Sequence, residues 1–125
     1  MAKGTYWQRG ESIDYTNSGD TTLAANTVVL YGSRLGIVAA DIPAGKTGAL
    51  LVEGVYELPK EYADSGKALT AGQEVQWDNS NSYIKAAVAQ VVAEGAVTTE
   101  ASAVHGFVVA AAASAAQKVL VKINA

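Results

Sequence analysis

The chain has 125 residues, a net charge of −3 and a pI near 5.0, and half of its residues are apolar. Its nine Lys and Arg residues are scattered, so the sequence lacks the cationic surface with which proteins neutralise nucleic-acid phosphates. It contains no cysteine, which excludes disulfides and thiol chemistry, and no run of 18 apolar residues that would predict a membrane span.

The first half of the chain predicts an exposed arm followed by short β-strands. Residues 1–10 are polar and include two adjacent aromatic residues, which indicates an arm or an edge segment. Alternating and β-branched residues between turn-rich segments are typical of strands. These strands are expected at residues 12–16, 27–31, 34–40 and 47–58.

The segment at residues 47–58 predicts a single long strand with one buried face. Leu50 and Leu58 fall on the same face because a strand has a period of two. Gly54 interrupts this pattern and indicates a bulge or a close approach of another backbone. Pro59 cannot donate to a ladder, so we expect the strand to end there.

The second half of the chain predicts further strands. Residues 73–78 and 83–86 flank the turn-forming segment 79–82, which indicates a hairpin. The alanine-rich residues 88–103 are expected to form a long loop with a strand in it, and residues 60–65 a short helical turn at most. Two more strands are expected at residues 104–113 and 117–124, the second with strict alternation of apolar and polar or exposed side chains.

Short strands at regular spacing, with turns between them, predict an all-β fold. We expect a compact β-sandwich or a partly open β-barrel, with an N-terminal arm at residues 1–10 and a single β domain at residues 11–125. The large share of alanine predicts a thin core, so self-association would add to stability.

No sequence pattern predicts a catalytic, cofactor or metal site. The segment Ala44–Thr47 resembles the end of a P-loop, but Ala40 stands where the pattern needs glycine and a strand follows instead of a helix, so we expect a β-turn with a solvated lysine. His105 is the only histidine and has no Cys or His partners for zinc, so a structural role is expected.

The acidic residues also predict no active site. Glu53 and Glu57 would lie roughly 13 Å apart on one strand, too far for the carboxylate pair of a glycosidase. With Lys46 and Lys60 near them, they indicate a solvated face. The aspartates mostly adjoin turns and lack calcium-loop spacing. We therefore expect no enzyme activity, no cofactor and no small-molecule substrate.

The two tryptophans are candidates for binding or packing. Trp77, between an apolar strand residue and the hairpin turn, is expected in the core or at an oligomer interface. Tyr6, Trp7 and Arg9 are residue types that dominate the binding energy of interfaces, so this part of the arm is expected to contact a partner.

Several segments, in order, resemble the capsid cement, or decoration, proteins of tailed bacteriophages. The matching segments are Gly10–Thr16, Thr27–Tyr31, Gly36–Gly48, Val52–Lys60, Ala71–Asp78 and Gly106–Asn124. Residues 86–103 depart from the family pattern because they are longer and richer in alanine. Each segment alone has low specificity, and their order and spacing carry the resemblance.

This resemblance implies a structural virion protein that is not an enzyme. It implies binding to the outer surface of the expanded head, with the major capsid protein as partner, Tyr6, Trp7 and Arg9 as capsid-binding residues, and a homotrimer as the assembly. It also implies a location on the outer capsid after synthesis in the cytoplasm of the bacterial host, which fits an N-terminus without the apolar region of a secretory signal.

Two other functions stay open at this point. The same fold could serve as a head-fibre base or a tail component, since a fold does not fix where it is used. A small enzyme or ligand-binding barrel that uses His105 and a carboxylate is the less favoured alternative, because the motifs for it are missing.

Overall fold

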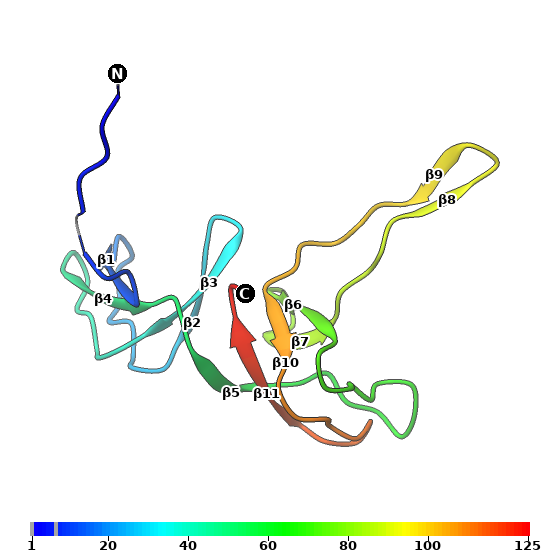
Figure 1. Ribbon diagram of the computed structural model, residues 1–125. Helices are drawn as coiled ribbons and strands as arrows, with labels where there is room; N and C mark the ends of the chain where they lie inside the picture. The colour runs from blue at the N-terminus through cyan, green and yellow to red at the C-terminus, as the bar shows by residue number, and fades with distance from the viewer. Residues whose placement is uncertain (1, 7) are drawn as a thin grey trace. The chain divides into compact units, whose positions relative to one another are not determined.

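The computed structural model describes residues 2–6 and 8–125, and the described residues form strands and no helix (Figure 1). The all-β prediction is therefore confirmed, and no closed barrel is present in the described part. The strands are β1 (Ser12–Thr16), β2 (Val28–Tyr31), β3 (Arg34–Val38), β4 (Thr47–Leu51), β5 (Val55–Pro59), β6 (Glu74–Asp78), β7 (Tyr83–Ala86), β8 (Val91–Ala93), β9 (Ala96–Thr99), β10 (Gly106–Val108) and β11 (Lys118–Ile123).

The strands form three sheets. One has four strands in the order β1-β4-β3-β2, one has five in the order β5-β11-β10-β6-β7, and β8 and β9 form a separate two-stranded hairpin. The chain divides into two compact units: unit 1 comprises Met1–Val29 and Gly36–Glu53, and unit 2 comprises Leu30–Leu35 and Gly54–Ala125. The division into an arm at residues 1–10 and one domain at residues 11–125 stays a prediction.

Unit 1 has a small apolar core beside the four-stranded sheet. Val38, Ile42 and Leu50 are buried together. Asn17 is also buried, and its side-chain amide donates to the carbonyl oxygens of Thr21 (2.7 Å) and Ile42 (2.9 Å). This amide therefore supplies the hydrogen bonds that buried loop backbone requires.

Unit 2 is organised around β11. Val119, Val121 and Ile123 of this strand are buried while the side chains between them are exposed, as the period-two pattern predicts. β11 pairs with β5 on one side and with β10 on the other. At the far edge, Ile84 of β7 forms a bridge with Lys60, the residue that follows β5.

Gly106 lies where β10 pairs with both neighbouring strands of unit 2. It faces Ile123 of β11 and Val75 of β6. Its φ is +159°, and a Cβ atom built there would overlap the carbonyl oxygen of Lys122. Only glycine therefore fits this point of the five-stranded sheet.

The prediction of one long strand at residues 47–58 is wrong. The chain forms β4 up to Leu51, and then β5 from Val55 in a different sheet. Gly54 lies between them with a φ of +123°, a conformation that side-chain-bearing residues rarely adopt. Leu50 is therefore buried in unit 1 and Leu58 in unit 2.

The prediction for residues 88–103 is also wrong, because they hold two strands instead of one. β8 and β9 are joined by the two-residue turn Glu94-Gly95, whose φ angles are +52° and +78°. Two other strands are shorter than predicted: β3 ends at Val38, and β10 covers only Gly106–Val108. The hairpin of β6 and β7 has the predicted place, whereas residues 60–65 form no helical turn.

Asn124, which follows the last strand, hydrogen-bonds to the backbone of Leu35. The side-chain amide of Asn124 accepts a hydrogen bond from the backbone N–H of Leu35 (2.9 Å) and donates one to the carbonyl oxygen of Leu35 (2.7 Å). Its own N–H donates to the carbonyl oxygen of His105 (2.7 Å). Asn124 thus holds the Leu30–Leu35 tip of the β2–β3 hairpin within unit 2.

Candidate functional site

The predicted partner-binding residues lie in the N-terminal arm. Residues 2–6 and 8–10 are exposed and form no strand, and the side chain of Tyr6 is 74% exposed. Arg9 Nε lies 3.1 Å from Glu11 Oε1 in an exposed ion pair. Trp7 lies outside the described residues. The arm is thus available to a partner, and its capsid-binding role stays a prediction.

Trp77 lies in the interior of unit 2 and is 7% exposed. Its indole N–H donates to Asn79 Oδ1 over 3.2 Å, and its backbone N–H donates to His105 Nδ1 over 2.8 Å. Its burial and both of these bonds suit the core alternative of the sequence analysis. The interface alternative for Trp77 stays a prediction.

His105 is buried and hydrogen-bonded instead of being exposed in a catalytic cleft. Its backbone N–H donates to the carbonyl oxygen of Val75 (2.9 Å), and its Nδ1 accepts the bond from Trp77. Burial lowers the pKa of the imidazole, because desolvation disfavours its charged form. Among the described residues, no group of three or more His, Cys, Asp or Glu could hold a metal ion.

The burial of His105 predicts that stability falls in mild acid. The unfolded chain takes up a proton near the ordinary pKa of about 6.5, whereas the folded chain does so only at lower pH. The free energy of unfolding is therefore expected to be constant above about pH 7 and to fall as the pH drops below about 6.5. Urea unfolding between pH 5 and 8 measures this slope.

His105→Asn is the matched variant for this experiment, because the amide oxygen of asparagine lies where Nδ1 lies and can accept the Trp77 bond without titrating. The slope between pH 5 and 7 is expected to disappear in H105N. An unchanged slope in the variant would assign the pH dependence to another group.

The lysine and glutamate predictions need two corrections. Lys60 is not solvated, because only 2% of its surface is exposed. It follows β5, forms a bridge with Ile84 of β7, and is covered by the loop before β11. Glu53 and Glu57 do not share a strand, since Gly54 separates β4 from β5. Glu57 is exposed and lies 3.7 Å from Lys118 Nζ on the neighbouring strand β11.

The ammonium group of Lys60 organises the loop before β11. Its Nζ donates to the carbonyl oxygens of Glu61 (2.7 Å), Ser114 (3.1 Å) and Ala116 (3.3 Å). Three N–H groups therefore meet three acceptors. Burial lowers the pKa of this ammonium, and the Glu61 charge partly opposes that effect. We assign Lys60 a structural role that the sequence analysis missed.

The segment that resembles a P-loop is a β-turn, as predicted. The N–H of Lys46 donates to the carbonyl oxygen of Pro43 (3.0 Å), Gly45 has a φ of +76°, and β4 follows. The Lys46 residue is exposed. The turn thus lacks the helix N-terminus with which a P-loop holds phosphate.

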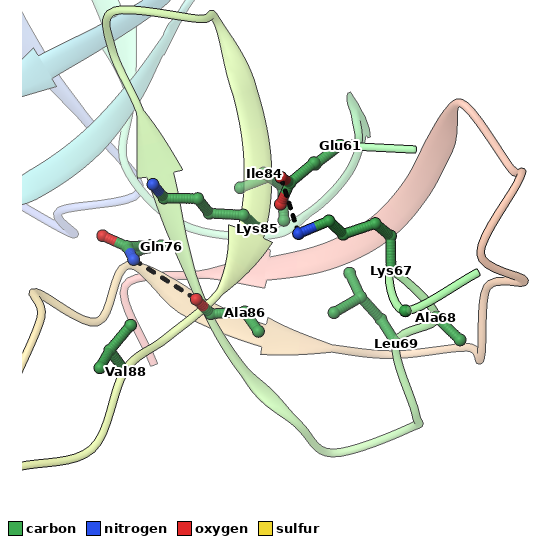
Figure 2. A pocket seen from close by; sticks show the side chains of 10 residues that line it. Glu61, Lys67, Ala68, Leu69, Gln76, Ile84, Lys85, Ala86 and Val88 are labelled. Atoms are coloured by element: carbon green, nitrogen blue, oxygen red, sulfur yellow. Dashed lines mark hydrogen bonds and ion pairs between the residues drawn. The ribbon is translucent and has the colours of Figure 1, made fainter. Parts of the chain in front are cut away.

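One hollow of unit 2 is an open cavity of about 260 Å³ (Figure 2). Leu69 and Ile84 supply its apolar lining, and both are buried. Lys67 and Lys85 line it with Glu61, which lies 3.1 Å from Lys67 Nζ.

The β8–β9 hairpin is the second exposed feature of unit 2. Every residue of β8 is exposed, and Val92 and Val97 are 57% and 45% exposed. Figure 1 shows the hairpin extending away from β6, β7 and β10 on two long chain segments. Near its base, Val88 and Ser102 exchange two hydrogen bonds of 2.7 and 2.8 Å.

The described residues therefore form an all-β protein with an exposed N-terminal segment and an exposed hairpin. No helix among residues 2–6 and 8–125 is long and apolar enough to cross a membrane. A comparison with protein families matches residues 7–123 to the phage cement protein family. The chain belongs to this family. Its role is therefore structural, as a capsid-stabilising component of the virion. No curated protein and no solved structure gave a significant match.

Proposed function

We propose that the protein binds the outer surface of the expanded phage head and stabilises contacts between neighbouring major capsid subunits. The family match across residues 7–123 carries this proposal, since cement proteins have a capsid-stabilising role. The exposed N-terminal arm and the exposed hairpin supply surfaces for such contacts. The protein is made in the host cytoplasm, acts without a cofactor or small-molecule substrate, and has no catalytic function.

A homotrimer is the assembly that we propose for this function. Three arms on one trimer bind multivalently, so modest single contacts give slow dissociation from the shell.

The net negative charge also suits a position outside the shell, because an acidic protein is not attracted to the packaged nucleic acid.

The arm supplies the first functional prediction. Deleting residues 1–10 is expected to weaken binding to expanded capsids by at least about tenfold, because aromatic and arginine side chains carry most interface energy. Tyr6→Ala is expected to act in the same direction. Co-sedimentation with expanded capsids over a concentration series measures both effects.

Tyr62→Ala is the matched control, because Tyr62 is 57% exposed but lies outside the arm. It is expected to bind as the wild type does. If the truncated chain also binds as the wild type does, the arm residues Tyr6, Trp7 and Arg9 are not the capsid contact.

A head-fibre base or a tail component is the alternative within virion proteins. Labelling intact virions separates the two: signal over the whole shell supports the cement function, and signal at the tail or at one vertex supports the alternative. A single introduced cysteine suffices for the label because the chain has none.

A further inference from the structure

We propose that the exposed face of the five-stranded sheet pairs with the same face of a second copy of this chain, with Phe107 of β10 beside the twofold axis. Such a contact is isologous, because both copies contribute the same residues. The inference goes beyond the proposed function and does not depend on it. An isologous contact joins copies in pairs, so the proposed trimer would form through a different surface.

This face of the sheet carries apolar side chains that unit 2 leaves uncovered. Paired residues of neighbouring strands point to the same side of a sheet, and Lys122 of β11 pairs with Phe107 on one side and with Val55 of β5 on the other. Val109 and Leu120 form the next row, since the N–H of Val109 donates to the carbonyl oxygen of Leu120 (2.9 Å). Val55, Val109 and Leu120 are 50%, 42% and 39% exposed. Exposed apolar side chains that adjoin across three strands indicate an interaction surface.

The charges on this face have opposite signs on the two sides of β10. Phe107 pairs with Lys122 of β11 on one side and with Glu74 of β6 on the other. Both charged residues are exposed, and neither forms an ion pair with another described residue. Within one sheet their backbones are roughly 10 Å apart, which is twice the spacing between strands. Lys122 and Glu74 are therefore both free to meet an opposite charge on another copy.

A twofold axis that runs along β10 between two stacked sheets satisfies both charges. β10 is the middle strand of the order β5-β11-β10-β6-β7, so the rotation places the β11 side of one sheet over the β6 side of the other. Phe107 and Val109 then face the same residues of the second copy, and Lys122 of each copy faces Glu74 of the other. Stacked sheets lie about 10 Å apart, a gap that a lysine and a glutamate side chain span together. The face thus complements itself in apolar surface and in charge, which selects a second copy as its occupant.

Charge reversal tests this contact in purified full-length protein, with the weight-average mass measured by light scattering over a concentration series. Lys122→Glu places like charges opposite each other at both ends of the contact, and Glu74→Lys does the same with the other sign. Each variant is expected to pair at least about tenfold more weakly than the wild type. An equimolar mixture of K122E and E74K restores attraction at both ends, so it is expected to pair although neither variant pairs alone. The double variant K122E/E74K is expected to pair as the wild type does.

The mixture is the decisive sample, because only a contact between copies can make two defective variants complement each other. Both variants stay net acidic, so their overall charge does not draw them together. Lys46→Glu and Asp64→Lys are the matched controls, since they make the same charge changes at exposed residues outside this face. Each control, and the mixture of the two, is expected to pair as the wild type does.

Two results would overturn the inference: a wild-type mass that does not rise with concentration, or a mixture of K122E and E74K that pairs no better than each variant alone. Capsid co-sedimentation of the wild type tests the proposed function separately. Protein that binds capsids without pairing in solution overturns only the sheet contact, whereas protein that pairs but fails to bind capsids overturns only the proposed function.

Discussion

Replacing Lys60 with methionine is expected to lower the free energy of unfolding by about 3 kcal/mol, although the substitution keeps most of the side-chain volume. The loss arises because the carbonyl oxygens of Glu61, Ser114 and Ala116 accept hydrogen bonds from Nζ at a residue that is almost fully buried. Hydrogen bonds to a charged group contribute about 1.5–3 kcal/mol each, and methionine can replace none of them. The expected net loss is smaller than the sum of three such bonds, because the substitution also removes the cost of burying the ammonium charge. Denaturant unfolding with a fitted m-value measures the change.

Lys118→Met is the control for this substitution, because the Lys118 side chain is 67% exposed and its ion pair with Glu57 spans 3.7 Å. Exposed pairs contribute about 0–1 kcal/mol, so this variant is expected to be nearly as stable as the wild type. Equal losses in the two variants would mean that Lys60 contributes through its chain volume and not through its three hydrogen bonds.

Gly106→Ala is expected to have the larger effect, about 4 kcal/mol or more, and the variant is expected to fold poorly at 37 °C. The new Cβ would overlap the backbone carbonyl oxygen of Lys122 and also approach Ile123 Cα at 3.1 Å. Backbone atoms of a paired strand cannot rotate away as a side chain can. The register between β10 and β11 would have to shift, and with it the burial of Val121. Thermal unfolding and soluble yield measure the result.

Gly66→Ala separates the overlap from the backbone strain. Gly66 has a φ of +81°, but nothing lies within 4 Å of the added Cβ. Its expected cost is about 1–2 kcal/mol, the penalty for a left-handed conformation alone. If G106A proves no worse than G66A, the close approach at Lys122 does not constrain this sheet.

Local patterns predicted the short strands well. The alternation in β11 identified its buried face, and the turn residues between β6 and β7 identified their hairpin. Both signals lie within a few neighbouring residues, where the period of a strand or the geometry of a turn determines the choice.

The errors have a common physical cause: the same alternation of apolar and polar residues is compatible with one long strand and with two shorter strands in different sheets. Leu50 and Leu58 have an even separation, so their pattern is the same whether they share one strand or lie in two sheets on either side of Gly54. The turn Glu94-Gly95 lacks the asparagine or aspartate that usually marks a two-residue hairpin. Its strands also show no clear alternation of apolar and charged residues.

Lys60 and the cavity could not be predicted because their partners are distant in the chain. Two of the carbonyl oxygens that accept hydrogen bonds from Lys60 Nζ belong to Ser114 and Ala116, which follow Lys60 by 54 and 56 positions in the sequence. Nothing in the sequence around Pro59 distinguishes this lysine from a solvated one. The cavity likewise combines the loop before β6 with β6 and β7 themselves. The exposure of residues 2–6 and 8–10, by contrast, follows from their polar composition, which needs no tertiary partner.

The position of Leu30–Leu35 has a consequence for a chain that is cut. Glu53 and Gly54 form the peptide bond at which the sequence passes from unit 1 to the rest of unit 2. Cleavage there would leave fragments 1–53 and 54–125, yet the first fragment carries Leu35, whose backbone Asn124 of the second fragment holds by two hydrogen bonds. A molecule nicked at this bond would therefore keep residues 30–35 of its first fragment in the same compact unit as its second fragment.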